Sequence, residues 1–236
     1  DIMRDGNFSF DRILVMDRYP LSCLGLCALA DEVAGRVCSE HISTLRALRQ
    51  ACQHYEGERL LLITELISNT ESLREGLAFL RELAPHIHSG QYRVMVCTGL
   101  SDPLLLKAIA NEDLSALVLR RESLSVLRNA INWALNSRPE VMLSPAVTEG
   151  LLLARGHKLT PRELEWLVTQ ADGMGLKASA KVMKVSYKTV SAWRYNIGRS
   201  TGFHGKSAIN RRLAQIRRSV TDDFIFADWS PESIDN

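Results

Sequence analysis

The chain has 236 residues, of which 46% are apolar and 24% are charged. These fractions are close to globular averages, so they exclude a wholly disordered or fibrous protein, and the length favours two domains. The sequence has no apolar run of about 18 residues and no basic stretch leading into an apolar one at its start, so we expect neither a membrane span nor a signal peptide. The five cysteines are odd in number and lack CxxC spacing, which favours reduced, buried thiols; we expect no metal and no cofactor.

Charge is distributed unevenly along the chain. Residues 155–218 hold 14 Lys and Arg against three acidic residues, a net charge of +11, whereas residues 219–236 carry −5 and residues 1–154 carry −4. A strongly basic segment joined to a neutral-to-acidic one is typical of a polyanion-binding module attached to a second domain. A solvated basic face without a partner has the same composition, so charge alone leaves both interpretations open.

Short apolar runs alternate with helical segments in the first part of the chain. Nearly continuous apolar runs, with one weaker run in a gap, predict buried strands at 13–16, 36–39, 60–64, 94–98 and 116–119. Apolar residues at helical spacing predict helices at 21–34, 44–55, 71–83, 103–110 and 123–136. This βα repeat predicts an α/β domain built on a doubly wound, five-stranded parallel sheet with helices on both faces.

Polar side chains follow the ends of four predicted strands. Asp17 and Arg18 follow the first, Glu65 follows the third, Thr98 ends the fourth and Arg120 follows the fifth. In a doubly wound sheet the functional crevice lies at the carboxyl ends of the strands, so we expect these side chains to lie together. The alternative is that they are ordinary solvated charges at loop ends.

The order and spacing of these pieces resemble the receiver domain of bacterial two-component response regulators over residues 11–137. The matching segments are VMDRYP at 15–20, ITEL at 63–66, VCTG at 96–99 and LVLR at 117–120. Receivers use an acidic pair to hold Mg²⁺, a phosphoacceptor aspartate, a hydroxyl and a lysine. The resemblance places Asp17 at the first acid, Glu65 at the phosphoacceptor position and Thr98 at the hydroxyl, with Arg18 and Arg120 at the second acid and the lysine.

Three of these five positions depart from the receiver pattern. Arg18 puts a cation where a divalent metal needs an oxygen ligand. The carboxylate of Glu65 is displaced by one methylene from that of an aspartate, which misaligns in-line attack on a phosphoryl donor. The guanidinium of Arg120 suits a carboxylate as well as a phosphoryl group. We therefore expect a degenerate receiver in which Glu65 pairs with Arg18 or Arg120 and imitates the phosphorylated charge arrangement or makes it unnecessary.

A linker and a purely helical segment follow this domain. Pro139 and Pro145 predict a linker over 138–157 with at most a short helix. Thr160 at the N-cap, with Pro and Glu one and three positions later, predicts a helix with a capping box. The pattern then predicts four helices at 161–171, 176–183, 187–200 and 206–218, and an acidic tail over 219–236. Helix, tight turn and helix within a basic segment indicate a helix-turn-helix domain at 158–218.

This segment resembles the DNA-binding domain of the LuxR/FixJ type of transcription regulator over about 60 residues. The residues that carry the resemblance are LTPRE at 159–163, Gly173, Ala180, Met183, Val185, Ser186, KTV at 188–190, Asn196, Ile197 and Ala208. A receiver followed by this domain is the layout of NarL/FixJ-like response regulators. The altered receiver is closest in character to auxiliary members of the RcsA and BglJ kind. Ser179, Trp193, Ser200 and Thr201 depart from the usual family residues.

The third predicted helix of this domain can be phased from its own sequence. With Val190 as origin, Ile197 falls within about 20° and Trp193 about 60° to one side, which predicts a core-facing stripe. The opposite face is predicted to enter the major groove of DNA and to contact bases through Lys188, Ser191, Ala192, Tyr195 and Arg199. Residues beside it are expected to hold phosphates: Lys177, Lys181, Lys184, Thr189 and Arg194. The alternative is a solvated polar face. Gly198 lies inside this helix, and we expect its far end to fray without DNA.

Three function hypotheses follow from these features. The first is a cytoplasmic, nucleoid-associated transcription regulator that binds double-stranded DNA without aspartate phosphorylation and has no enzymatic activity. The second is a conventional phosphorylated response regulator, and the third is a protein-binding adaptor that has lost DNA binding.

Helix-turn-helix domains of this size reach useful specificity by pairing on two half-sites, so we expect a homodimer or a heterodimer with a related LuxR-type regulator. Two apolar sets are candidate pairing surfaces. One comprises Ile209, Leu213 and Ile216, which are also candidates for the core, and the other comprises Leu104, Leu105, Leu124 and Leu127.

Overall fold

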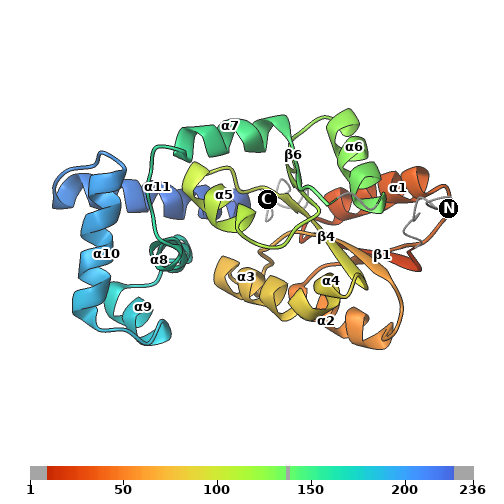
Figure 1. Cartoon of the computed structure of the whole chain (residues 1–236), viewed down its shortest axis with the longest axis horizontal. Coiled ribbons are helices and arrows are strands. Elements are labelled where there is room, and N and C mark those ends of the chain that lie inside the picture. Colours follow the sequence, from red (N-terminus) through yellow and green to blue (C-terminus); the bar gives the residue numbers. More distant parts are fainter. Residues whose placement is uncertain (1–9, 137–138, 226–236) are drawn as a thin grey trace, which may run out of the picture. The chain divides into compact units, whose positions relative to one another are not determined.

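A computed structural model describes residues 10–136 and 139–225 of the chain (Figure 1). The described residues form two compact units. One lies within residues 10–99 and 112–147, and the other within residues 100–111 and 148–225. Both units are therefore discontinuous in sequence, whereas the domain ranges predicted from the sequence are contiguous and stay a prediction. No helix within the described ranges is both long and apolar enough to cross a membrane.

The first unit is built on a parallel sheet with the strand order β2-β1-β3-β4-β5-β6. The strands are β1 Arg12–Met16, β2 Ser39–Ile42, β3 Leu60–Thr64, β4 Tyr92–Thr98, β5 Ala116–Leu119 and β6 Met142–Leu143. The chain order reverses beside β1, which pairs with β2 on one side and β3 on the other. Parallel pairing throughout confirms the doubly wound architecture, in which the carboxyl ends of the strands share one edge.

Two strands differ from the sequence prediction. The sheet has a sixth strand, β6, inside the predicted linker: Met142 N–H donates to Ser115 O (3.0 Å) and Ser144 N–H to Leu117 O (3.1 Å). A two-residue edge strand is too short to produce a hydrophobic period. Strand β2 begins at Ser39 rather than at residue 36, because the Asp31 carboxylate accepts the N–H groups of Cys38 (3.0 Å) and Ser39 (2.9 Å).

Helices cover both faces of this sheet. Their bounds are α1 Pro20–Ala34, α2 Leu45–His54, α3 Leu73–Glu82, α4 Ala84–His88 and α6 Leu124–Leu135. Figure 1 shows α1 and α6 on one side of the strands and α2, α3 and α4 on the other. Alternate strand residues such as Val15, Ile63 and Val118 are fully buried against α1 and α6 in one hydrophobic core. Helix α4 was not predicted, because it is a single short segment that continues directly from α3.

The second unit consists of helices. They are α5 Pro103–Ala110, α7 Pro145–Ala154, whose first three residues belong to the first unit, α8 Pro161–Ala171, α9 Leu176–Val182, α10 Tyr187–Ser200 and α11 Lys206–Ile225. The predicted capping box of α8 is present: Thr160 Oγ1 accepts from Glu163 N, and Glu163 Oε2 accepts from Thr160 N (2.8 Å). Within this unit Arg212 binds the Asp102 carboxylate through two nitrogens, at 2.8 and 3.2 Å.

Helix α11 extends beyond the predicted end at residue 218 and reaches Ile225, so the first residues of the predicted acidic tail are helical. Val220, at the i+4 position from Ile216, is buried and continues the apolar stripe of this helix. Residues 226–236 lie outside the described residues.

Both predicted apolar pairing surfaces are largely core. Ile209, Leu213 and Ile216 are buried within the second unit. Leu104, Leu105 and Leu127 are also buried, and Leu124 alone of that set is exposed, at 66% of its surface. Apolar periodicity identifies the inward face of a helix but does not identify what covers it. The expectation that these leucines form a free surface is therefore wrong for all but Leu124.

Gly198 in α10 has a packing role that the sequence did not reveal. A Cβ added there would lie 2.4 Å from Ile209 Cγ1 and 2.9 Å from the backbone O of Phe203. Phe203 N–H also donates to Gly198 O (2.8 Å). The glycine therefore lets α11 and the α10–α11 loop approach the end of α10, and this contact opposes the fraying expected from helix propensity.

Gly76 in α3 has an equivalent role beside the carboxyl ends of the strands. Its added Cβ would lie 2.0 Å from the backbone O of Leu66, the second residue after β3. Among the described residues, no atom outside its chain neighbours and its own helix backbone lies within 4 Å of a Cβ added to Gly25 in α1.

We predict opposite effects for alanine at these two helical positions. Gly76→Ala should lower the free energy of unfolding by about 1–3 kcal/mol because the backbone of Leu66 must move. Gly25→Ala should raise it by up to about 1 kcal/mol because only helix propensity changes. Urea titrations of both variants check this, and a stabilised Gly76→Ala protein would contradict the close approach of α3.

Candidate functional site

The five residues predicted to meet at the ends of the strands lie on neighbouring strand ends. Asp17 and Arg18 follow β1, Glu65 follows β3, Thr98 ends β4 and Arg120 follows β5. All but Arg120 are at least 95% buried, and the side chain of Arg120 is 19% exposed. Arg120 N–H donates to Thr98 O (2.9 Å), which fixes the end of β5 against β4.

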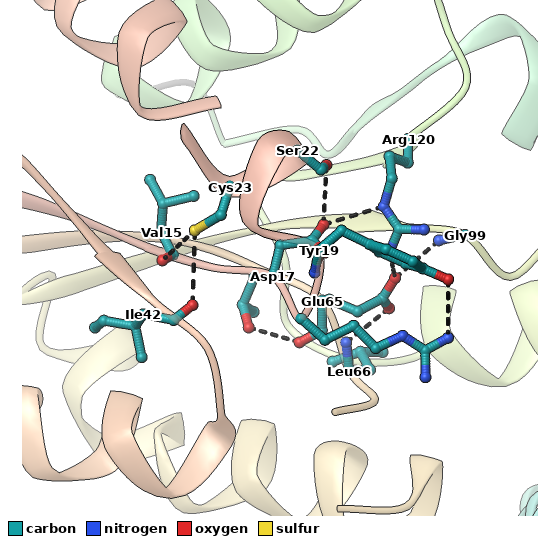
Figure 2. Close-up of polar contacts among 12 residues, drawn as sticks. Val15, Asp17, Tyr19, Ser22, Cys23, Ile42, Glu65, Leu66, Gly99 and Arg120 are labelled. Atoms are coloured by element: carbon teal, nitrogen blue, oxygen red, sulfur yellow. Dashed lines mark hydrogen bonds and ion pairs between the residues drawn. The ribbon is translucent and has the colours of Figure 1, made fainter. Parts of the chain in front are cut away.

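Glu65 is held by three donors. Arg120 Nη2 lies 2.6 Å from its Oε2, Gly99 N–H donates to the same oxygen (2.8 Å), and Leu66 N–H donates to Oε1 (2.8 Å). Of the two arginines proposed as partners, the structure places Arg120 against Glu65. Figure 2 shows the guanidinium of Arg120 directed at this carboxylate.

Arg120 also binds the second buried carboxylate of the cluster. Its Nε lies 3.0 Å from Asp17 Oδ2, which accepts a further hydrogen bond from Ser22 Oγ (3.2 Å). The other oxygen, Oδ1, accepts from Tyr19 N–H (2.8 Å) at the start of α1. One guanidinium therefore joins two carboxylates that belong to different strands (Figure 2).

The donor set does not fit a divalent cation. Both oxygens of Asp17 and both oxygens of Glu65 already accept hydrogen bonds from N–H or O–H groups. Arg120 supplies a positive charge where a metal would supply its own, and Arg18 adds a second positive charge beside it. The described residues contain no group of three or more His, Cys, Asp or Glu arranged to hold a metal ion.

Tyr19 lies between the two arginines. The Arg120 guanidinium carbon is 4.5 Å from the centre of its ring, and that of Arg18 is 5.1 Å away. Arg18 Nη2 reaches the hydroxyl of Tyr19 at 3.5 Å. Both distances are within the range of cation–π attraction, so the ring holds the two positive charges on one side of the cluster.

The pKa of Glu65 responds to opposing influences. Burial raises the pKa of its carboxyl above the ordinary value, Arg120 lowers it, the Asp17 carboxylate raises it, and the N–H groups of Leu66 and Gly99 lower it, with a net rise. The ionised form of Glu65 therefore depends on Arg120 for compensation.

Sequence reasoning missed four members of the cluster. Tyr19 and Gly99 lie in the segments that carried the resemblance. They contribute the face of an aromatic ring and a backbone N–H, which a pattern of charged residues does not reveal. Leu66 also contributes only its backbone. Ser22 is the third residue of α1, and no feature of the sequence marks it.

Most of the residues predicted to contact DNA are exposed in the second unit, whereas Thr189 and Arg194 are partly buried. Lys188, Ser191, Ala192, Tyr195 and Arg199 are exposed on α10, while Val190 and Ile197 on its other side are buried. Tyr195 exposes 63% of its surface. Lys177 and Lys181 on α9 and Lys184 in the following turn are also exposed. The phase of α10 agrees with that inferred from its sequence, and the contacts with DNA stay a prediction.

Two of the predicted phosphate contacts have structural partners. Arg194 Nη2 donates to Asn210 Oδ1 on α11. Thr189 donates its N–H to Ser186 Oγ (3.1 Å), and the two hydroxyls lie 2.9 Å apart. Thr189 therefore belongs to the N-cap of α10, and Arg194 joins α10 to α11.

Comparison with known proteins shows similarity to bacterial transcription regulators. No protein-family model matches the chain. The transcriptional regulatory protein RcsB of Salmonella typhimurium is 24% identical over 165 residues, which cover 69% of this chain and 76% of the relative. RcsB of Salmonella typhi matches over the same length with the same identity.

Solved structures share the fold. RcsB from Salmonella enterica serovar Typhimurium, bound to promoter rprA in the presence of the phosphomimetic BeF3−, matches with a TM-score of 0.65 and 21% identity over 87% of this chain and 99% of that one. A further structure of the Salmonella typhimurium RcsB response regulator has a TM-score of 0.61 and 19% identity, covering 88% and 98% of the two chains. The arrangement of a parallel sheet with helices followed by a helical segment is therefore that of solved response regulators.

We predict that Arg120→Met lowers the free energy of unfolding of the first unit by about 3–5 kcal/mol at neutral pH, because two buried carboxylates lose their shared cation. The loss should shrink as the pH falls. Without Arg120 the pKa of Glu65 in the folded protein rises further. A carboxyl whose pKa is raised by folding stabilises the protein at pH values below its unfolded-state pKa. This contribution is lost as the pH rises through the folded-state pKa.

Hydrogen exchange of β1, β3 and β4 across a pH series measures this effect without interference from the second unit. Arg128→Met is the matched control, because Arg128 pairs with Glu32 (3.2 Å) on the surface, and it should show little change at any pH. An equal loss for Arg120→Met at every pH would contradict the proposed electrostatic cause.

Proposed function

We propose that this chain is a sequence-specific DNA-binding transcription regulator whose atypical receiver-like domain works without aspartate phosphorylation. The observation that carries the DNA-binding part is the exposed face of α10, bordered by the basic residues of α9. The observation that carries the second part is the 2.6 Å contact between Arg120 Nη2 and Glu65 Oε2.

The case for DNA rests on charge and exposure together. Residues 173–221 contain Lys and Arg but no Asp or Glu, so the positive charges of α9 and α10 have no acidic neighbours within that segment. Lys188, Ser191 and Tyr195 offer hydrogen bonds to base edges, and Ala192 offers apolar contact with a thymine methyl. The similarity to RcsB, one of whose solved structures is bound to promoter rprA, supports the same assignment.

The case against phosphorylation rests on the occupied carboxylates. In-line attack needs a carboxylate oxygen that a phosphoryl donor can reach, and Glu65 is only 1% exposed, with both of its oxygens accepting hydrogen bonds. Arg120 already neutralises the negative charge of the Glu65 carboxylate, to which a phosphoryl group would add further negative charge. We infer an internal ion pair that stands permanently in place of the phosphorylated arrangement, as expected of an auxiliary regulator of the RcsA and BglJ kind.

Two other functions compete with this proposal. In a conventional response regulator, the Glu65–Arg120 pair would have to open to admit a phosphoryl donor and Mg²⁺. In an adaptor that has lost DNA binding, the uncompensated positive face of α9 and α10 would have no role.

We also infer that the chain pairs with itself or with a related regulator on two half-sites, and that the receiver-like domain provides the partner surface. The complex would act in the cytoplasm, on the nucleoid.

We predict two classes of DNA-binding variant. Lys188→Ala and Tyr195→Ala should lower affinity for the cognate site, located by genome-wide mapping of bound sites, by about 1–3 kcal/mol and relax base preference. Lys181→Ala, a change on α9, should weaken binding to all DNA sequences equally. It should also reduce by about one the salt slope, which is the slope of log affinity against log salt concentration. Salt titrations of each variant on cognate and scrambled duplexes check this, and identical behaviour of the two classes would contradict the assignment of α10 to the bases.

We predict that acyl phosphate with Mg²⁺ neither phosphorylates the protein nor changes its DNA affinity, because the donor set already satisfies Glu65. Intact-mass measurement and a binding titration on the same sample check both parts. A stoichiometric, acid-labile phosphate on Glu65 or Asp17 would favour the conventional response regulator instead.

A further inference from the structure

The turn between α9 and α10 contains an unusual backbone conformation. Lys184 has a φ of 55°, and within residues 10–136 and 139–225 it is the only residue other than glycine with a positive φ. A side chain with a Cβ is disfavoured in this left-handed region, and an unbranched lysine lacks the short polar group that makes Asn or Asp tolerable there.

The conformation belongs to a regular helix ending. Lys184 N–H donates to Lys181 O (3.2 Å) and Val185 N–H donates to Ala180 O (3.0 Å), which is the bond pattern of the Schellman motif. This motif requires a left-handed residue at the position of Lys184, and that residue is usually glycine.

The neighbouring helices of the same unit provide a direct comparison. At the end of α8, Gly173 donates to Gln170 O and Met174 to Thr169 O. At the end of α10, Gly202 donates to Arg199 O and the next residue to Gly198 O. Both glycines have positive φ, at 83° and 76°. Three consecutive helices therefore end in the same motif, and only the middle one has a residue other than glycine.

Hydrogen bonds hold the chain on both sides of Lys184. Arg162 Nη2 donates to Met183 O (3.1 Å), which fixes the residue before Lys184 from α8. Ser186 caps α10 by accepting from Thr189 N–H (3.1 Å), which fixes the chain two residues after Lys184. An unfavourable conformation persists when the surroundings determine it in this way.

Within the described fold, the side chain of Lys184 does not offset the cost of this backbone conformation. It is exposed, and no side-chain hydrogen bond or ion pair of Lys184 is present among the described residues. No acidic residue lies between Asp172 and Asp222, so the segment itself offers it no counter-charge. Exposed Lys181 on α9 and exposed Lys188 on α10 flank it in the sequence by three and four residues.

We propose that Lys184 occupies the position that glycine usually takes in this turn, and that its ammonium binds a DNA backbone phosphate. The lysine therefore lowers folding stability and raises affinity for DNA. This inference rests on the proposed function and assigns its ligand, a phosphodiester oxygen of duplex DNA. Contact with phosphate fixes the register of α10 and carries no base preference.

The test compares Lys184→Gly, Lys184→Asn and Lys184→Arg. Glycine and asparagine remove the charge and suit the left-handed conformation, so the melting temperature of the second unit should rise by about 2–5 °C. Affinity for a mixed-sequence duplex of about 30 base pairs should fall about three- to tenfold, and the salt slope should decrease by about one. Arginine keeps the charge and the strain, so it should keep both wild-type affinity and wild-type stability.

Lys188→Ala, measured on the same duplex and on the cognate site, separates the two proposals. If Lys188→Ala loses affinity for the cognate site while Lys184→Gly and Lys184→Asn bind the mixed-sequence duplex with an unchanged salt slope, the role of Lys184 is overturned. The proposal that the protein binds DNA is then still supported. If the wild-type protein binds the duplex with no salt dependence, the proposed function itself fails. If Lys184→Gly and Lys184→Asn do not raise the melting temperature, the claim that the turn gives up stability is overturned.

Discussion

The guanidinium of Arg120 is the interaction on which the first unit depends. It joins Asp17 and Glu65, two carboxylates that follow different strands and are almost wholly removed from water. Burying either acid alone is costly, and burying both requires a cation in reach of each. Because the sheet is parallel, the strand ends converge at one edge, and a single planar group with several donors can serve both acids. Arg18, which lies against Tyr19, brings the formal charge of the two acids and two arginines to zero.

Much of this arrangement could be predicted from the sequence. Polar residues after four apolar runs had to meet at one edge once the runs formed a parallel sheet, and the pairing of Glu65 with an arginine followed from that. The choice of Arg120 over Arg18 could not be predicted, because it depends on side-chain direction rather than on position. The backbone donors Leu66 and Gly99 could not be predicted for a related reason: every residue except proline has a backbone N–H, and only the fold determines what it points at.

Other differences have similar physical causes. Strand β6 and helix α4 are too short to show a period, and the leucines of α5 were assigned to a surface because periodicity does not reveal what covers an apolar face. Gly76 and Gly198 illustrate the reverse case. A propensity scale counts a helical glycine as a defect, whereas in both helices the missing side chain allows backbone from another segment to approach. Whether glycine weakens or stabilises a helix is decided by its neighbours in space.

The second unit includes α5, which the chain reaches long before the rest of that unit. The bond between Asp102 and Arg212 joins residues 110 positions apart, and Leu106 lies against Gly150 in the same unit. During synthesis, therefore, α5 leaves the ribosome well before its partners α8 and α11 exist. A fragment that starts at residue 148 lacks the buried leucines of α5 altogether. The helical unit therefore depends on a segment that is distant in the sequence, and the bond between Asp102 and Arg212 forms only after α11 has been synthesised.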